Sequence, residues 1–181
     1  GRKWSHWPTW NMRLSCTEMD PLPVSPRPFF DEAMGSWLGR IAGLYRMPLA
    51  EINARYQLKL PLDVTRVGWL LLPSLSADTM QRLESLTRVS LSRIQELQTP
   101  EGWIREEHRW CFCRSCLAMN KADLTAPYWQ RRWLNPAFHE CALHAGEMES
   151  LGTRRIGNCG NMVDLIKCVA AKLKRRDRAP I

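Results

Sequence analysis

Two closely spaced pairs of metal-binding side chains constrain this chain more than any other feature of its sequence. Cys113 and Cys116 form a C-x2-C pair. After 24 intervening residues, Cys141 and His144 form a C-x2-H pair. Each pair turns tightly enough to direct both donor atoms toward one point, and two pairs give a tetrahedral site. Three thiolates and one imidazole suit Zn²⁺, and four protein ligands leave no position for water, so we predict one structural Zn²⁺.

The other donors near this motif lead to different expectations. Cys111 and His139 each lie two residues from a predicted ligand and are spare donors, which we expect to point away from the metal. Cys159 and Cys168 have no partner at zinc spacing. The alternative to a metal site is a set of buried free cysteines that pack as small hydrophobic residues.

The composition predicts a folded protein with reduced cysteines. The chain has 181 residues, which fits one domain or two small ones that share a core, and 45% of them are hydrophobic. Seven cysteines are an odd number and no signal peptide is visible, so we do not expect a disulfide scaffold. The longest strongly apolar run covers residues 67–72 (V-G-W-L-L-L), far too short to span a membrane. We expect a cytoplasmic protein without a membrane partner.

Basic residues are concentrated at the two ends of the chain. The net charge is +8, to which residues 1–18 contribute +2, residues 167–181 contribute +5 and residues 19–166 only +1. A basic end of this kind attracts phosphates without reading a base sequence, or it only keeps the chain solvated. The nucleic-acid-binding candidates at this end are Lys174, Arg175 and Arg176.

The apolar periodicity predicts a mainly α protein, in which a helical bundle containing a helix-turn-helix precedes a small zinc-finger module of the zinc-ribbon kind. In the bundle we expect helices at residues 31–45, 48–54, 64–72, 76–86 and 91–97, starting at Asp31, Pro48, Asp63, Ser76 or Asp78, and Ser90. The chain would divide into a tail (1–20), a helical domain (21–102), the zinc-finger module (103–151) and a C-terminal helix with a basic tail (152–181).

The last two helices of the bundle lie across a tight turn at residues 87–90, as in a helix-turn-helix. If this unit reads duplex DNA, the residues in contact would be Arg88, Ser92, Arg93 and Gln95. The near-neutral charge of residues 19–104 favours the alternative that these side chains only solvate the helix.

Within the zinc-finger module, we expect a strand at residues 108–112 that enters the C-x2-C turn. A helix at residues 142–151 would carry His144 near its start, and a last helix would follow at residues 162–174. Aromatic side chains would cover the metal, namely Tyr128, Trp129 and Trp133. Arg131 and Arg132 interleave with them, a mixture that can bind bases and phosphates or simply pack around a small core.

With these residues described, the chain resembles the TniQ family of bacterial transposon target selectors. The segment 26–42 (P-R-P-F-F-D-E-A-M-G-S-W-L-G-R-I-A) is similar to the family's opening P-x-x-x-E-x-x-x-S-W-L-x-R-x-A. The second similar stretch is its zinc module, here C-x-x-C-L at residues 113–117, P-Y-W at 127–129, Trp133, and C-x-x-H at 141–144. The two stretches and the helices between them cover residues 21–151.

The resemblance implies an accessory protein of transposition that is not itself the transposase. It would help to choose the target by contacting target DNA or an RNA-guided effector complex, and it would recruit an AAA+ regulator of the TnsC/TniB type. It implies metal binding by the four predicted ligands, a bacterial cytoplasmic location and, for Glu32, Ser36, Trp37 and Arg40, mainly roles in the fold. Many members have further cysteines after the histidine and a longer C-terminus, whereas Cys159 stands alone here. This chain therefore resembles a short, adaptor-like member, and it could form homo-oligomers.

Two other functions compete with that of a non-catalytic adaptor. One is a transcriptional regulator whose helix-turn-helix binds duplex DNA directly. The other is an enzyme in which Cys111 or Cys141 is the nucleophile and His108, His139 or His144 is the base. The chain has no Gly-rich phosphate loop and no H-E-x-x-H motif, and a closed four-ligand site offers no reactive position, so we predict no catalytic residues.

Overall fold

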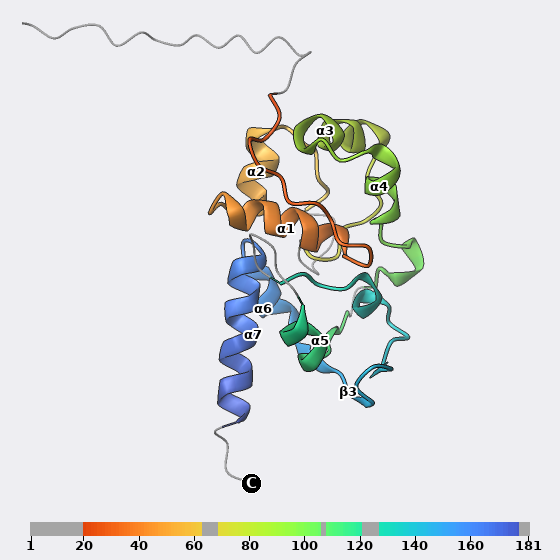
Figure 1. Cartoon of the computed structure of the whole chain (residues 1–181), viewed down its shortest axis with the longest axis vertical. Coiled ribbons are helices and arrows are strands. Elements are labelled where there is room, and N and C mark those ends of the chain that lie inside the picture. Colours follow the sequence, from red (N-terminus) through yellow and green to blue (C-terminus); the bar gives the residue numbers. More distant parts are fainter. Residues whose placement is uncertain (1–19, 63–68, 106–107, 121–126, 178–181) are drawn as a thin grey trace, which may run out of the picture.

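Helices make up most of the regular secondary structure (Figure 1). Residues 103–151, which contain the predicted ligands and are called the metal-binding part below, consist mainly of short strands, turns and one short α-helix. The computed structural model describes residues 20–62, 69–105, 108–120 and 127–177. The predicted tail at residues 1–20 therefore lies outside the described residues except for its last position. The α-helices are α1 (Met34–Leu44), α2 (Leu49–Arg55), α3 (Ala77–Thr87), α4 (Leu91–Glu96), α5 (Arg114–Met119), α6 (Thr153–Gly157) and α7 (Met162–Arg176).

The helix α1 lies at the centre of the molecule and packs against α7 (Figure 1). Its buried face includes Trp37, Leu38 and Ile41, as the apolar spacing predicts. The prediction of Asp31 as its N-cap is wrong, because the N-cap is Ala33. The Asp31 carboxylate instead accepts a hydrogen bond from the Tyr128 hydroxyl at 2.9 Å, so a contact across the fold replaces the local cap.

The pair α3 and α4 meets across a turn close to the one predicted at residues 87–90. Ser76 caps α3 by accepting a hydrogen bond from the Thr79 backbone N–H at 3.2 Å. Arg88 ends α3 in the left-handed region, with φ of 56°. Leu83 and Ile94 are fully buried between these helices and the rest of the bundle, so the pair is part of the core.

The predicted helix at residues 64–72 falls partly outside the described residues, and its described part, 69–72, is not helical. This segment lies directly against α1 at Gly35. A Cβ atom added to Gly35 would lie 2.5 Å from the carbonyl oxygens of both Trp69 and Leu70. Residues 69–72 therefore form a buried turn whose backbone is held against α1.

The prediction of a helix at residues 142–151 is also wrong. Strand β1 (Trp110–Phe112) pairs antiparallel with β4 (Glu149–Leu151), so that Cys111 lies opposite Ser150. Strand β2 (Glu140–Cys141) pairs antiparallel with β3 (Gly146–Glu147). A tight turn between β2 and β3 replaces the first helical turn, because the Cys141 carbonyl accepts hydrogen bonds from both His144 N–H and Ala145 N–H.

One hydrophobic core joins the three predicted folded regions. It contains residues of the predicted helical domain, of the zinc-finger module and of the C-terminal helix, for example Trp37, Leu83, Trp129, Leu165 and Val169. The boundaries at 102/103 and 151/152 therefore separate stretches of sequence that share a core. Within the described part of the chain, no helix combines the length and apolar character needed to cross a membrane.

Candidate metal centre

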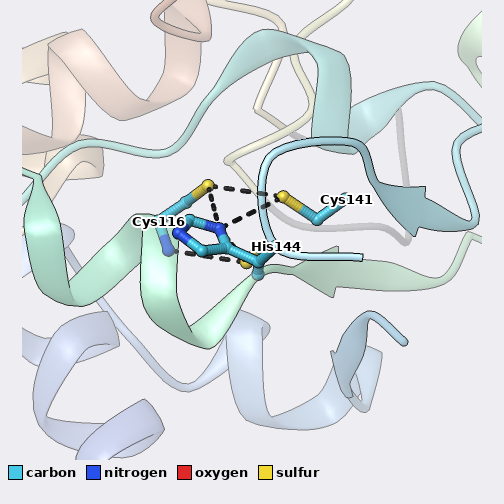
Figure 2. A group of neighbouring side chains, drawn as sticks. Cys116, Cys141 and His144 are labelled. Carbon is cyan, nitrogen blue, oxygen red and sulfur yellow. Dashed lines mark hydrogen bonds between the residues drawn. The ribbon is translucent and has the colours of Figure 1, made fainter. Parts of the chain in front are cut away.

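The four predicted ligands come together at one point, although they lie in two segments of the chain. The Sγ atoms of Cys113, Cys116 and Cys141 and a ring nitrogen of His144 all lie within 4.8 Å of one another. The Cys116 and Cys141 Sγ atoms are 3.5 Å apart, and His144 Nδ1 is 3.4–3.5 Å from each of the three sulfurs. Figure 2 shows the imidazole of His144 beside the sulfurs of Cys116 and Cys141, with dashed lines from one ring nitrogen to both.

These separations fit a tetrahedral metal site. With metal–sulfur bonds of about 2.3 Å and metal–nitrogen bonds of about 2.0–2.1 Å, a tetrahedron has S–S edges of about 3.7 Å and S–N edges of about 3.5 Å. Four of the six edges measure 3.4–3.5 Å, within a few tenths of an ångström of these values, and the two sulfur–sulfur edges at Cys113 are at most 4.8 Å. The four donors could therefore hold one metal ion after an adjustment at Cys113, and they would use all four coordination positions.

Local backbone structure positions each ligand pair. Cys113 is the N-cap of α5, and its sulfur accepts a hydrogen bond from Cys116 N–H at 3.4 Å. Cys141 ends β2, and His144 closes the turn that follows it. Ala145 then adopts a left-handed conformation with φ of 43°, which returns the chain into β3. Both knuckles are therefore tight turns, as the two-residue spacings predict.

The electrostatics of the cluster favour a cation. Burial and hydrogen bonding with Cys141 and Cys113 raise the pKa of Cys116 to about 12. Burial acts in the same direction on Cys141, but hydrogen bonds with His144, Cys113 and Cys116 outweigh it and lower its pKa to about 6. Without a metal, Cys141 therefore favours the thiolate and Cys116 the protonated thiol. Three thiolates can coexist at this distance only beside a positive charge, so metal binding must release protons.

Two of the three aromatic side chains predicted to cover the metal pack together in the core. Trp129 and Trp133 are fully buried, and their ring centroids are 5.4 Å apart in an edge-to-face contact. Trp129 also lies 5.4 Å from Phe112, the residue before the Cys113 ligand. Tyr128 points elsewhere, because its ring stacks on Phe29 at 4.4 Å. It therefore ties the metal-binding part to the segment before α1.

A buried polar network connects α1 to the metal-binding part. Glu32, Ser36 and Arg40 follow one another at four-residue spacing, and all three are fully buried. The Glu32 carboxylate accepts hydrogen bonds from Ser36 Oγ at 2.8 Å and from Arg40 Nε at 2.9 Å. Ser36 Oγ in turn accepts from Trp129 N–H at 2.8 Å, and Trp37 Nε1 donates to the Pro26 carbonyl at 2.9 Å. The roles expected of these motif residues in the fold agree with this network, but its link to Trp129 could not be read from spacing.

Two of the predicted nucleic-acid-binding arginines make intramolecular contacts. Arg93 donates to the carbonyls of Pro28 and Phe29, and its Nη1 is 2.5 Å from a Glu96 carboxylate oxygen. Arg131 donates to the carbonyls of Glu96 and Gln98 at 3.0 and 3.2 Å, which links α4 to the metal-binding part. Both guanidinium groups thus link separate segments of the protein by hydrogen bonds.

The remaining basic candidates lie nearer the surface. Arg88 is exposed at the turn between α3 and α4, and Arg132 lies over the Phe138 ring at 5.6 Å. Lys174, Arg175 and Arg176 are exposed in the last turns of α7, where Arg176 forms an ion pair with Glu149. These basic groups are therefore spread over three parts of the fold.

Among the described residues, the other cysteines and histidines lie outside the cluster, including Cys111 and His139, as expected. These two residues line a separate small pocket together with His108. Cys159 is buried, its thiol donates to the Arg155 carbonyl at 3.1 Å, and burial together with the neighbouring Cys168 raises its pKa to about 11.

No family model, curated protein or solved structure matches the chain significantly.

Proposed function

We propose that this chain is a non-catalytic, TniQ-like accessory protein of transposition that contains one structural Zn²⁺ ion. It would help to select the target by bridging target DNA or an RNA-guided effector complex to an AAA+ regulator of the TnsC/TniB type. This function follows from the resemblance of residues 26–42 and 113–144 to the two characteristic stretches of that family.

The observation that carries the proposal is the physical link between these two stretches. Ser36, in the first, accepts a hydrogen bond from the backbone N–H of Trp129, in the second, across 93 positions of sequence. Glu32 also forms a β-bridge with Gln130. If the two stretches matched the family pattern only by chance, their residues would have no reason to meet in one buried network. The contact therefore supports treating the two stretches as parts of one motif.

The geometry of the ligand cluster supports a role as a scaffold. Its four donors would saturate a tetrahedral Zn²⁺, whereas catalytic zinc sites keep one position open for water or substrate. A metal used in this way stabilises the surrounding turns and contributes directly to folding. We therefore assign the binding of partners to the surface and only a structural role to the metal.

Contacts of α4 favour an adaptor over the competing transcriptional regulator. A recognition helix needs side chains that are free to reach base edges in the major groove. In α4, Arg93 is engaged with two backbone carbonyls and with Glu96, and the helix has only six residues. Direct readout would have to rely on Ser92 and Gln95 in α4 and on Arg88 at the preceding turn, all of which are exposed.

The test is retention of the AAA+ regulator by the zinc-loaded full chain. The immobilised chain would be incubated with a purified TnsC/TniB-type ATPase from the same genome, in ATP and in ADP, with and without duplex DNA. We expect retention that persists without DNA and in salt that abolishes non-specific phosphate contacts. The matched variant Lys174→Ala/Arg175→Ala removes exposed charge from α7 and should weaken DNA binding while leaving ATPase retention unchanged.

A different result would favour the regulator. Failure to retain the ATPase in either nucleotide state, together with site-selective binding of duplex DNA and a steep salt dependence, is the behaviour of a direct DNA reader. That outcome would refute the bridging role, and zinc analysis of the same preparation would show whether the metal site survives it.

A further inference from the structure

A small pocket lies beside β1 and includes none of the four residues of the Cys/His cluster. It is formed by the segment that leads into β1 and by the loop that precedes β2. Its volume is about 150 Å³, whereas a single water needs only about 10–15 Å³. The side chains that matter for its chemistry are those of Arg105, His108, Arg109, Asn135 and Phe138.

The buried imidazole of His108 has an unused nitrogen in this pocket. The residue is only 7% exposed, its ring is held by an edge contact with Trp110 at 4.9 Å, and its Nε2 atom has no hydrogen-bond partner in the described part of the chain. Buried polar atoms are almost always paired, by protein or by ordered water. The Nε2 atom of His108 is therefore available to any hydrogen-bonding molecule that enters the pocket.

The charge of the pocket indicates an anion. Arg105 and Arg109 are exposed on either side of His108, and within the described residues neither takes part in an ion pair. None of the described residues that line the pocket is acidic. Burial, and then the charge of Arg105, lower the pKa of His108, so its ring is neutral near pH 7. Glu106 and Glu107, between these groups in sequence, lie outside the described residues.

The remaining wall suits an anion that carries an organic group. Asn135 Oδ1 accepts a hydrogen bond from Ala137 N–H at 3.0 Å, which leaves its amide N–H groups for a ligand. Phe138 adds an aromatic surface, with the Arg132 guanidinium 5.6 Å from its ring centroid. Guanidinium groups bind phosphate oxygens in a bidentate manner, and aromatic rings stack with nucleobases.

We propose that this pocket is a phosphate-binding site. Arg105 and Arg109 pair with the phosphate oxygens. His108, in the tautomer that carries its proton on Nε2, donates this N–H to the phosphate. The phosphate comes either from a nucleic acid, as an internal phosphodiester or a terminal phosphate, or from a free phosphate compound. This site goes beyond the proposed bridging function and does not depend on it.

The test is a titration of the zinc-loaded full chain followed by NMR of the histidine ring nitrogens. Three probes separate the sources of phosphate: inorganic phosphate, a short single-stranded oligonucleotide with a 5′-hydroxyl, and the same oligonucleotide with a 5′-phosphate. Acetate serves as the carboxylate probe. We expect a saturable shift of His108 Nε2 with at least one phosphate probe and weaker binding of acetate.

The decisive comparison uses two double variants of equal charge. Arg105→Ala/Arg109→Ala should raise the dissociation constant at least about tenfold, because each guanidinium provides charge-assisted hydrogen bonds. Arg154→Ala/Arg155→Ala removes the same charge from exposed positions of α6 and should change it less than about twofold. All four positions are exposed, and unchanged zinc content and melting temperature would show that the variants keep their fold.

Three results would overturn the proposal: no saturable shift of His108 with any phosphate probe, equal losses in the two double variants, or tighter binding of acetate than of phosphate. The last result would indicate a carboxylate of an acidic protein segment. Retention of the AAA+ regulator is measured separately, so loss of the phosphate site with retained ATPase, or the reverse, distinguishes failure of this inference from failure of the proposed function.

Discussion

Replacing Arg40 with methionine tests the buried network that joins α1 to the metal-binding part. Arg40 and Glu32 are both fully buried, and they form an ion pair at 2.9 Å. The Glu32 carboxylate accepts from Arg40 Nε and Nη2, from Ser36 Oγ and from Phe29 N–H, at 2.8–3.1 Å. Arg40→Met keeps most of the side-chain volume but removes two of these donors and the balancing charge.

The expected cost follows from these contacts. Two hydrogen bonds that involve charged groups are worth about 1.5–3 kcal/mol each, and removing one partner of a buried ion pair costs about 3–5 kcal/mol. We therefore expect Arg40→Met to lower the free energy of unfolding by about 3–5 kcal/mol at pH 7.5. In the double variant Glu32→Gln/Arg40→Met no unpaired carboxylate remains, so its cost should be smaller than the sum of the single costs by about 2–3 kcal/mol.

The penalty should also depend on pH, with a definite sign. Burial already raises the pKa of Glu32, against the opposing effect of Arg40. Without Arg40 this pKa rises further above that of the unfolded chain, so the folded variant binds a proton that the unfolded chain has lost. The variant therefore gains stability relative to the wild type as pH falls through the raised pKa. The difference can change by up to about 1.4 kcal/mol per pH unit.

Urea unfolding followed by tryptophan fluorescence, in saturating Zn²⁺ at pH 8, 7 and 6, measures these quantities. Comparing variant and wild type at each pH cancels the pH dependence of metal binding, which both proteins share. A cost below about 1 kcal/mol, a difference that is constant between pH 8 and 6, or additive single costs would refute the assignment of a buried, charge-balanced pair.

Three further predictions concern the metal site and the close approach of backbone segments. One Zn²⁺ should bind per chain, and its affinity should increase as pH rises because Cys116 must lose a proton. In chelator competition, Cys116→Ser should lower the affinity for Zn²⁺ at least about a hundredfold. Ala145→Gly should stabilise the chain by about 1 kcal/mol in thermal melting because φ is 43°, whereas Ala145→Val should destabilise it. Gly35→Ala should cost about 3 kcal/mol or more because its Cβ would lie 2.5 Å from backbone carbonyls, whereas Gly102→Ala, with open space around it, should be nearly neutral in urea unfolding.

Each of these has an outcome that contradicts it. Tight zinc binding by Cys116→Ser would show that this thiol is not a ligand. Equal melting temperatures for the glycine and valine variants of Ala145 would show that the turn does not demand a left-handed conformation. Similar stabilities for the Gly35 and Gly102 variants would remove the close contact between α1 and residues 69–72.

Features set by short-range chemistry could be predicted from the sequence. The two-residue spacings identify all four residues of the Cys/His cluster because the turn that joins each pair is local. The same holds for α3, which starts at Ser76, one of its two predicted starts, through a side-chain cap to Thr79 three residues away. Apolar periodicity placed α7 within two residues of its observed end at Arg176.

Features set by partners distant in sequence could not be predicted in this way. Residues 142–151 contain no helix-breaking proline, yet Ser150 pairs with Cys111 in a sheet and the metal-binding turn occupies the start of the segment. Asp31 is a good N-cap by type, but the Tyr128 hydroxyl engages it. The pocket beside β1 could not be predicted for the same reason, because Arg105 and Asn135 come from separate loops whose proximity depends on the complete fold.

The link between Ser36 and Trp129 leads to a last prediction. Removing the metal should unfold the metal-binding part and the helical bundle together. Trp129 contacts Phe112, which precedes the Cys113 ligand, and its backbone N–H bonds to Ser36 inside the Glu32–Arg40 network. Losing the metal frees the turns that hold Phe112 and Trp129, so α1 loses packing and hydrogen bonds at once. Chelation should therefore lower near-ultraviolet and far-ultraviolet circular dichroism in one coincident transition. If helical signal survives while only the aromatic signal is lost, the bundle folds independently and the network contributes little to coupling.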